Sequence, residues 1–232
     1  GSEMCIRDSG LGGLNARIEL SQIAATEIHK EYPNCTKIKY RNNGLAEIVL
    51  YPNLARNYIM NQDDKPLQLP EIDPADVYEI YDMLENMTVP LQSGHGSRAR
   101  SFGMSYRAAV LGKIIPRAKK VYQDTVFTKE NPLLYEKVCE LGNKICPFHF
   151  GAIQLNHNVV CPPHRDGGNS GKSLLISFGD YDGGKICIEG YGEYDTNCRP
   201  LIFDGKKLLH WNTPITSGNK YSLVYFYRPN ER

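Results

Sequence analysis

The sequence predicts a mainly β fold with flanking helices, in which N-terminal helices precede a C-terminal β-core. Helix-start signals followed by apolar residues at helical spacing occur before Cys146. After Cys146, short apolar or alternating runs are separated by clusters of Gly, Asp, Asn and Pro, which is typical of an all-β sandwich or barrel. A chain of 232 residues is long enough to bury one substantial core.

A first helix is expected soon after the start of the chain. Gly1-Ser2 resembles a cleavage scar, so residues 1–10 are interpreted as a non-native leader. The organised chain is then expected to begin near Leu11. The helix prediction rests on three apolar residues among helix formers, at Leu14, Ile18 and Ile28.

Two further helices carry clearer start signals. Asp73 precedes Pro74, and Asn131 precedes Pro132, so each pair matches a capping residue followed by proline at the first helical position. The expected apolar stripes are Val77, Ile80, Tyr81 and Leu84 in one helix, and Leu134, Val138, Leu141 and Ile145 in the other. Both stripes are expected to face the interior.

Five runs after Cys146 are expected to be strands: GAIQLNHNVV, SLLISFG, KICIEG, RPLIFDG and YSLVYFYR. The turn around Asp182-Gly183-Gly184 is the strongest hairpin signal. Residues 147–232 are therefore expected to form the β-core, and residues 11–146 a helical part that braces it within one integrated domain.

Composition excludes several classes of protein. The net charge of +1 gives no general attraction to polyanions. No apolar run reaches the roughly 18 residues of a membrane span, and no secretory signal is recognisable, so a soluble intracellular protein without a membrane partner is expected. The seven cysteines form no C-x-x-C pair, which favours reduced thiols over disulfides or a zinc knuckle. No obligate protein partner is evident.

The stretch CPPHRDGG indicates a metal site. Two prolines fix an extended approach, and an extended H-x-D directs His164 and Asp166 toward one face. His210 ends a predicted strand and is the candidate third ligand. Two histidines and one carboxylate on one face match the arrangement of non-haem Fe(II) oxygenases, which leaves coordination positions open. The alternative is a capping pair in a turn with a core histidine.

Two residues are candidates for holding a dicarboxylate cosubstrate. Lys220 opens the run KYSLVYF, which is expected to form a strand antiparallel to the one carrying His210. A cation there would bind the distal carboxylate of a molecule whose other end chelates iron. Asn156 is expected to point into the barrel toward the cosubstrate, although asparagines at strand ends more often bond to the backbone.

The segment from Gln154 to Arg228 resembles the Fe(II)/2-oxoglutarate-dependent dioxygenases, and within them the TET/JBP group, which oxidises the methyl group of a pyrimidine in nucleic acid. The resemblance rests on HRDGGN, on GDYDGG, on FDGKKLLHWNTPITSGNKYSLVYF and on the spacing between them. It covers about a third of the chain. It implies a double-stranded β-helix core of the jelly-roll, cupin-like kind.

Carried over by position, the resemblance makes His164, Asp166 and His210 the iron ligands. It makes Lys220 and Ser222 the partners of a 2-oxoglutarate carboxylate. TET/JBP members usually place arginine at the position of Lys220, so a bidentate fork is exchanged here for a point charge.

The resemblance also implies a substrate and cofactors. Asn169 matches the position that hydrogen-bonds the flipped base, whereas Arg228 stands where TET-like enzymes offer a histidine to cytosine. The implied reaction uses Fe(II), 2-oxoglutarate and O2, with ascorbate expected to stimulate it. The implied substrate is 5-methylcytosine in DNA, oxidised to 5-hydroxymethylcytosine while flipped out or single-stranded.

A basic stretch before the core offers candidate nucleic-acid contacts. Residues 97–120 contain Arg98, Arg100 and Arg107, further lysines and arginines, and no acidic residue. The alternative is a solvated surface whose charges pair with the acidic helix between Glu71 and Glu85.

Three other functions are compatible with the same motifs. One is hydroxylation of a protein side chain or a small metabolite. Another is AlkB-like demethylation, which ranks lower because Phe226 stands where that pattern has a second arginine. The third is a catalytically silent cupin-like binding module, which would require the loss of a ligand, and none is lost.

Overall fold

The computed structural model describes residues 65–92, 105–115 and 121–228 in full, and earlier residues only where four strands form. The chain divides into two compact units, Gly1–Asp63 and Asp64–Arg232. The first unit contains an antiparallel sheet in the order β1-β2-β4-β3. Its strands are β1 (Met4–Asp8), β2 (Leu14–Glu19), β3 (Lys37–Tyr40) and β4 (Leu45–Leu50).

The expected first helix is wrong over its opening residues, because Leu14–Glu19 is strand β2. The sequence LNARIE alternates strictly between apolar and polar residues, and this period of two belongs to a strand rather than a helix. The rest of the expected helix, including Ile28, lies outside the described residues. The segment interpreted as a leader contributes β1, which pairs with β2 along its length.

The second unit is built on a large antiparallel sheet in the order β5-β14-β10-β17-β9-β7-β6, with β8 paired to β7. Its strands are β5 (Leu67–Gln68), β6 (Leu91–Gln92), β7 (Tyr106–Ile114), β8 (Gln123–Asp124), β9 (Ala152–His157), β10 (Ser173–Phe178), β14 (Leu201–Phe203) and β17 (Tyr221–Phe226). Strands were expected only after Cys146, so the long β7 corrects that expectation. The buried residues of β7 come as two adjacent pairs, Ala108-Ala109 and Leu111-Gly112, so the segment lacks the alternation that marks a strand in a sequence.

Two smaller sheets complete the unit. In the two-stranded sheet, β11 (Tyr181–Gly183) pairs with β16 (Ile215–Gly218). In the three-stranded sheet, β12 (Ile186–Ile188) lies between β13 (Gly192–Tyr194) and β15 (His210–Asn212). All five strand runs expected after Cys146 are confirmed. The expected hairpin at Asp182-Gly183-Gly184 is wrong, because β11 pairs with β16 while β12 pairs with β13 and β15. Gly183 and Gly184 have positive φ angles. They lie where the pairing of β11 with β16 shifts register and the chain passes on to β12, and at Gly183 the backbone comes close to Pro214.

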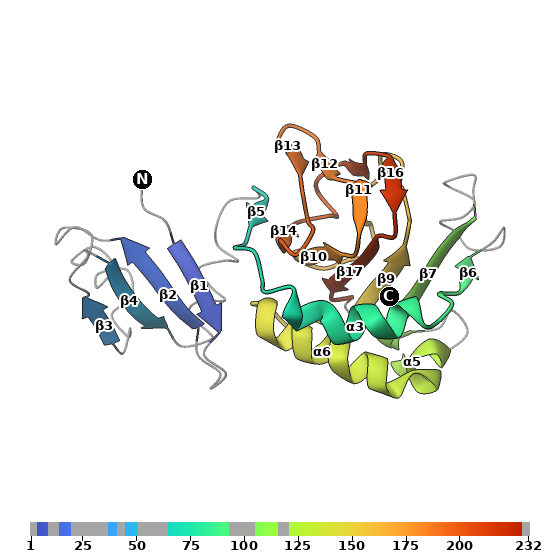
Figure 1. Ribbon diagram of the computed structural model, residues 1–232, viewed down its shortest axis with the longest axis horizontal. Helices are drawn as coiled ribbons and strands as arrows, with labels where there is room; N and C mark the ends of the chain where they lie inside the picture. Colours follow the sequence, from blue (N-terminus) through green and yellow to red (C-terminus); the bar gives the residue numbers. More distant parts are fainter. Residues whose placement is uncertain are drawn as a thin grey trace. The chain divides into compact units, whose positions relative to one another are not determined.

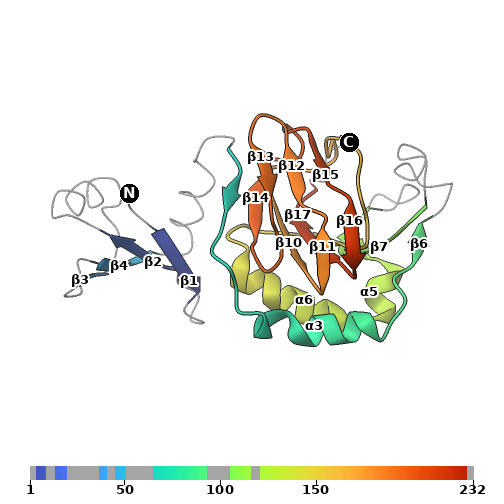
Figure 2. The same ribbon diagram turned by 45° about the horizontal axis from the view of Figure 1, so that its top comes forward.

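Helices cover one side of the β-structure (Figures 1 and 2). They are α3 (Ala75–Glu85), α5 (Val126–Glu130) and α6 (Pro132–Ile145). Helix α3 begins one residue later than expected, with Pro74 as its N-cap, and the N–H of Ala75 donates to the Asp73 carboxylate at 3.0 Å. In α6, Asn131 is the N-cap and Pro132 follows it, as expected. The expected stripes are buried at Val77, Ile80 and Leu84 of α3, and at Leu134, Val138 and Leu141 of α6.

The acidic side chains of α3 pair with lysines of α6. Lys137 lies 2.8 Å from Glu79, and Lys144 lies 2.6 Å from Asp76. Two acidic residues of the helix that was the alternative partner of the basic stretch are therefore paired with lysines of α6. Each pair is solvent-exposed on at least one side and therefore contributes little to the stability of the fold.

The two faces of β17 have different partners. The hydroxyls of Tyr221 and Tyr225 donate to the backbone oxygens of Leu84 in α3 and Val138 in α6, at 3.3 and 2.8 Å. Successive strand residues point to opposite faces, so the intervening residues of β17 face away from the helices. Between the sheets lies a cluster of buried apolar residues: Leu175, Ile186, Ile188, Leu201 and Phe203.

The described cysteines are all free, as expected for reduced thiols. They are Cys139, Cys146, Cys161, Cys187 and Cys198. Within the described residues, no helix is long and apolar enough to cross a membrane.

Gly142 provides a test of how α6 packs on β17. A Cβ atom there would collide with the ring of Tyr225, which is fully buried, and would lie 2.7 Å from Cζ of Phe150. We expect Gly142→Ala to lower the free energy of unfolding by about 1–3 kcal/mol, although alanine favours a helix over glycine by about 1 kcal/mol. Denaturant unfolding measures this change.

The matched control is Asn143→Ala, at the exposed next position of the same helix. It is expected to be neutral or slightly stabilising. Equal stability of the Gly142→Ala protein and the wild type would contradict the close packing of α6 on β17.

Candidate metal centre and adjoining pocket

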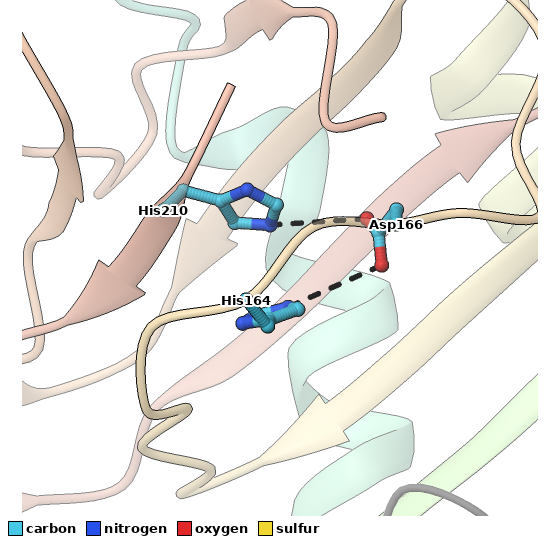
Figure 3. Close-up of side chains that lie close together, drawn as sticks. All are labelled: His164, Asp166 and His210. Carbon is cyan, nitrogen blue, oxygen red and sulfur yellow. Dashed lines mark ion pairs between the residues drawn. The ribbon is translucent and has the colours of Figure 1, made fainter. Parts of the chain in front are cut away.

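Three side chains converge where the loop before β10 meets strand β15 of the three-stranded sheet. Their potential ligand atoms all lie within 4.8 Å of one another, and they belong to His164, Asp166 and His210 (Figure 3). The Nε2 atoms of His164 and His210 lie 4.0 and 3.8 Å from different carboxylate oxygens of Asp166. The structure thus brings together all three residues of the expected triad.

Backbone hydrogen bonds attach the H-x-D loop to β15. The N–H of His164 donates to the carbonyl of His210, and the N–H of His210 donates back to the carbonyl of His164, both at 3.0 Å. The N–H of Asp166 donates to Gly205 at 2.8 Å. Arg165, between the ligands, turns outward and donates to the carbonyl of Lys207. The expected extended H-x-D geometry is therefore present.

Each histidine is held in one tautomer. Nδ1 of His164 lies 2.8 Å from the carbonyl of Pro162, and Nδ1 of His210 lies 2.9 Å from the carbonyl of Leu208. A carbonyl oxygen only accepts, so each Nδ1 carries the proton. Each Nε2 then faces Asp166, which is the orientation that metal-bound histidines require, since the neutral ring would present its lone pair there.

Close packing surrounds the carboxylate. A Cβ atom at Gly205 would lie 3.0 Å from Oδ2 of Asp166 and 3.4 Å from Cε1 of His210. Phe203 packs edge-on against the His210 ring at 5.0 Å. Two imidazoles and one carboxylate on one face fit Fe(II), because they leave coordination positions open toward the pocket.

One pocket of about 740 Å³, measured out to its open mouth, adjoins the triad. Its lining contains all eight residues expected to bind metal, cosubstrate or base: His164, Asp166, His210, Lys220, Ser222, Asn156, Asn169 and Arg228. It also contains residues that the sequence analysis missed: Gln154, Val159, Cys161, Leu175, Ile186, Phe203, Asn212, Val224 and Phe226. A period of two from Asn156 and from Ser222 would have indicated Gln154, Val224 and Phe226.

Lys220 is 5% exposed and lies at the pocket wall. Its Nζ donates to the carbonyl of Gly184 and lies 5.5 Å from the centre of the Tyr181 ring. Burial lowers the pKa of the Lys220 ammonium to about 8, and Asp195 and Cys161 offset part of the lowering. Lys220 thus approaches deprotonation in mildly alkaline solution unless an anion binds.

The strand that follows Lys220 was expected to lie beside the strand of His210, and this prediction is wrong. Strand β17 lies between β9 and β10 in the large sheet, whereas β15 belongs to the three-stranded sheet. Lys220 and His210 therefore meet across the pocket. Strand β16, which the sequence analysis did not predict, lies between β15 and β17 in the chain.

Two asparagines near Lys220 have different partners. Asn158 clasps the backbone of Lys220, since its N–H donates to the Lys220 carbonyl at 2.9 Å and its Oδ1 accepts from the Lys220 N–H at 2.7 Å. It does so with a φ of 52°, which asparagine tolerates. Asn156 points into the pocket, and its amide donates to Oγ of Ser222 at 3.2 Å.

Asn169 and Arg228 lie together at another part of the pocket. Asn169 is 4% exposed, and its Nδ2 donates to Oγ of Ser173 at 3.3 Å. Nε of Arg228 lies 3.5 Å from Oδ1 of Asn169, and its guanidinium lies 5.3 Å from the centre of the Phe226 ring. A guanidinium donor and an amide therefore sit side by side.

The expected nucleic-acid contacts lie apart from this pocket or outside the described residues. Arg107 is exposed on β7 and does not line the pocket, and its Nη1 donates to the carbonyl of Val89 at 2.9 Å. Arg98 and Arg100 lie outside the described residues.

Comparison with solved structures adds a fold likeness. NgTET1 in complex with 5mC DNA matches with a TM-score of 0.51 and 16% sequence identity, over 71% of this chain and 72% of that one. The fold resembles that of a 2-oxoglutarate- and Fe(II)-dependent oxygenase of the TET kind. A scan of protein-family models and a search of curated proteins gave no match.

Two further matches are weaker. An oxidoreductase of the 2OG-Fe(II) oxygenase family from Burkholderia pseudomallei matches with a TM-score of 0.48 and 15% identity, over 77% of this chain and 92% of that one. A prolyl hydroxylase from Trichoplax adhaerens, in complex with a hypoxia inducible factor peptide fragment, matches with a TM-score of 0.46 and 12% identity, over 75% of this chain and 90% of that one.

The triad predicts a divalent metal site that depends on His210. We expect the wild type to bind Fe(II) or Mn(II) and His210→Ala to lose at least about 100-fold in affinity, because even changes to residues that only orient a ligand cost 10–100-fold. Calorimetric titration measures the affinity, and circular dichroism confirms that the variant is folded.

His149→Ala is the control, since His149 is exposed and its ring packs on Tyr227 instead of the triad. It should bind metal as the wild type does. Undiminished affinity in His210→Ala would remove His210 from the site.

Proposed function

We propose that the protein is an Fe(II)- and 2-oxoglutarate-dependent dioxygenase that oxidises 5-methylcytosine in DNA to 5-hydroxymethylcytosine. The observation that carries the proposal is one pocket whose wall holds both the His164, Asp166 and His210 triad and the buried cation of Lys220. A metal that chelates one end of a dicarboxylate and an ammonium that binds the other end together select 2-oxoglutarate.

The residues around the pocket divide the work of binding and positioning. Bound iron would supply O2 activation, coupled to conversion of 2-oxoglutarate into succinate and CO2. Lys220 binds the distal carboxylate, with Ser222 and Asn156 offering hydrogen bonds on the same face of the sheet. The apolar walls, Leu175, Ile186, Phe203 and Val224, keep water away from the reacting atoms.

Hydrogen-bonding groups beside the triad support a base as the substrate. Asn169 lies three residues after Asp166, and its backbone N–H donates to the Asp166 carbonyl at 3.1 Å, so the backbone of Asn169 is fixed relative to the candidate metal ligand. Its side-chain Nδ2 donates to Oγ of Ser173 at 3.3 Å, which orients the amide. Arg228 can only donate, which suits the carbonyl of a pyrimidine. The fold likeness to NgTET1, whose solved complex holds 5mC DNA, favours the same substrate class here.

DNA must present the base outside its stack, because a methyl group inside a duplex cannot enter a pocket of this kind. Unstacking costs a few kcal/mol, which contacts outside the pocket have to offset. Arg107, with Arg98 and Arg100, remains the proposed source of phosphate contacts. A catalytically silent binding module has less support, since all three potential ligands lie together.

A panel of oligonucleotides tests the substrate. The protein is incubated with Fe(II), 2-oxoglutarate and ascorbate, together with single- and double-stranded DNA containing 5-methylcytosine, cytosine or N-methylated bases, and the nucleosides are analysed by mass spectrometry. We expect 5-hydroxymethylcytosine from the methylated DNA. Asn169→Ala should slow this reaction about 10- to 100-fold through loss of a buried hydrogen bond, with little change in uncoupled 2-oxoglutarate consumption.

The DNA proposal would be abandoned if no pyrimidine were oxidised while a peptide or metabolite stimulated 2-oxoglutarate turnover. Products from N-methylated bases alone would instead support demethylation of the AlkB kind. Arg165→Ala serves as a control, because Arg165 is in the same loop but turns away from the pocket.

The role of Lys220 predicts a pH dependence of 2-oxoglutarate binding. Its ammonium loses the proton as pH rises through about 8, so affinity for the dianion should fall above that pH. A bound carboxylate raises the pKa again, and the fall should therefore approach tenfold per pH unit. Lys220→Ala should bind at least about tenfold more weakly at pH 7 and show no such dependence.

Calorimetry between pH 7 and 9.5 measures both effects, with the exposed Lys185→Ala as the control. An alanine variant at position 220 that bound 2-oxoglutarate as tightly as the wild type would assign the carboxylate to another cation, and Arg228 would be tested first.

A further inference from the structure

Gln154 lies in the pocket between the cosubstrate residues and Arg228. On β9 it points to the same face of the sheet as Asn156, and in the pairing of β9 with β17 it lies opposite Val224. The preceding pair on this face is Asn156 with Ser222, toward Lys220, and Phe226 follows in the direction of Arg228. The position of Gln154 therefore adjoins the cosubstrate region on its substrate side.

The orientation of the Gln154 amide is fixed by its backbone partners. Nε2 donates to the carbonyl of Ala109 on β7 at 3.2 Å and to the carbonyl of Leu155 at 3.1 Å. Both partners only accept, so both amide hydrogens are used. A reversed amide would place Oε1 against two carbonyl oxygens, which is repulsive.

Oε1 of Gln154 is consequently a fixed acceptor. Among the described residues, none donates a hydrogen bond to it. No fully buried side-chain nitrogen or oxygen in the described part of the chain lacks a partner, so Oε1 is reachable from the pocket that Gln154 lines. A carboxylate of 2-oxoglutarate has only acceptors and cannot pair with it. A ligand group that pairs with Oε1 must carry a hydrogen-bond donor, which points to the substrate and not to the cosubstrate.

We propose that Gln154 selects the base, by accepting a hydrogen bond from the exocyclic amino group of cytosine. Thymine has a carbonyl oxygen where cytosine has this amino group, so thymine would place an acceptor against an acceptor. Gln154 then discriminates between two bases that both carry a methyl group at the same ring position. The assignment rests on the proposed oxidation of a pyrimidine in DNA.

The test compares two substrates in one sequence context. Oligonucleotides carry either 5-methylcytosine or thymine at the target position, and kcat/KM for oxidation is measured for each with the wild type and with Gln154→Met. Methionine keeps the length and flexibility of glutamine but has no strong acceptor. We expect the preference for 5-methylcytosine to fall about tenfold, mainly through a slower reaction of 5-methylcytosine.

Gln92→Met is the matched control. Gln92 makes the same kind of bond, from Nε2 to the carbonyl of Ala108 on β7 at 2.8 Å, but it does not line the pocket. Its variant should keep the wild-type preference. Metal and 2-oxoglutarate affinities, measured for each protein, should stay unchanged and show that Gln154→Met leaves the site assembled.

The outcomes separate the two proposals. If the wild type oxidises 5-methylcytosine and Gln154→Met retains the same preference over thymine, the selection by Gln154 is overturned and the proposed function stands. If Gln154→Met slows both substrates equally, Gln154 has a packing role and the selection is again overturned. If the wild type oxidises neither base, the proposed function fails and the selection fails with it.

Discussion

The reciprocal backbone hydrogen bonds between His164 and His210 are the constraint on which the site depends. A loop that carries two candidate ligands is joined by them to the strand that carries the third. Because the pairing is made by backbone atoms, both side chains remain available, and carbonyls of Pro162 and Leu208 fix their tautomers. The hydrogen bond from the N–H of Asp166 to the carbonyl of Gly205 positions the third residue of the triad.

The two-faced character of β17 connects this site to the rest of the fold. Its tyrosines bond to backbone carbonyls of α3 and α6, while alternate residues from Lys220 to Arg228 face the pocket. A shift of β17 by one residue would exchange these faces. The helices therefore hold in register the strand that presents Lys220, the proposed cosubstrate-binding cation, and Asn158 fixes the backbone of Lys220 directly.

Local sequence signals predicted most of the helices and strands of the second unit. The predictions that failed concern which distant strands pair with one another. Proline and capping residues located α3 and α6, and the H-x-D spacing located the triad. The pair Gly183-Gly184 misled, because positive φ serves a strand irregularity as well as a tight turn. The neighbours of β17 and the fixed amide of Gln154 both depend on which strands pair, and spacing within one strand does not contain that information.

The proposed binding of Fe(II) and 2-oxoglutarate together in one pocket has a direct spectroscopic test. Fe(II) chelated by 2-oxoglutarate has a visible charge-transfer absorption, which can be recorded under anaerobic conditions without any nucleic-acid substrate. We expect this band to appear when 2-oxoglutarate is added to the Fe(II)-loaded wild type, and to be absent in Asp166→Ala. A wild-type protein that showed no band at saturating Fe(II) and 2-oxoglutarate would contradict the account.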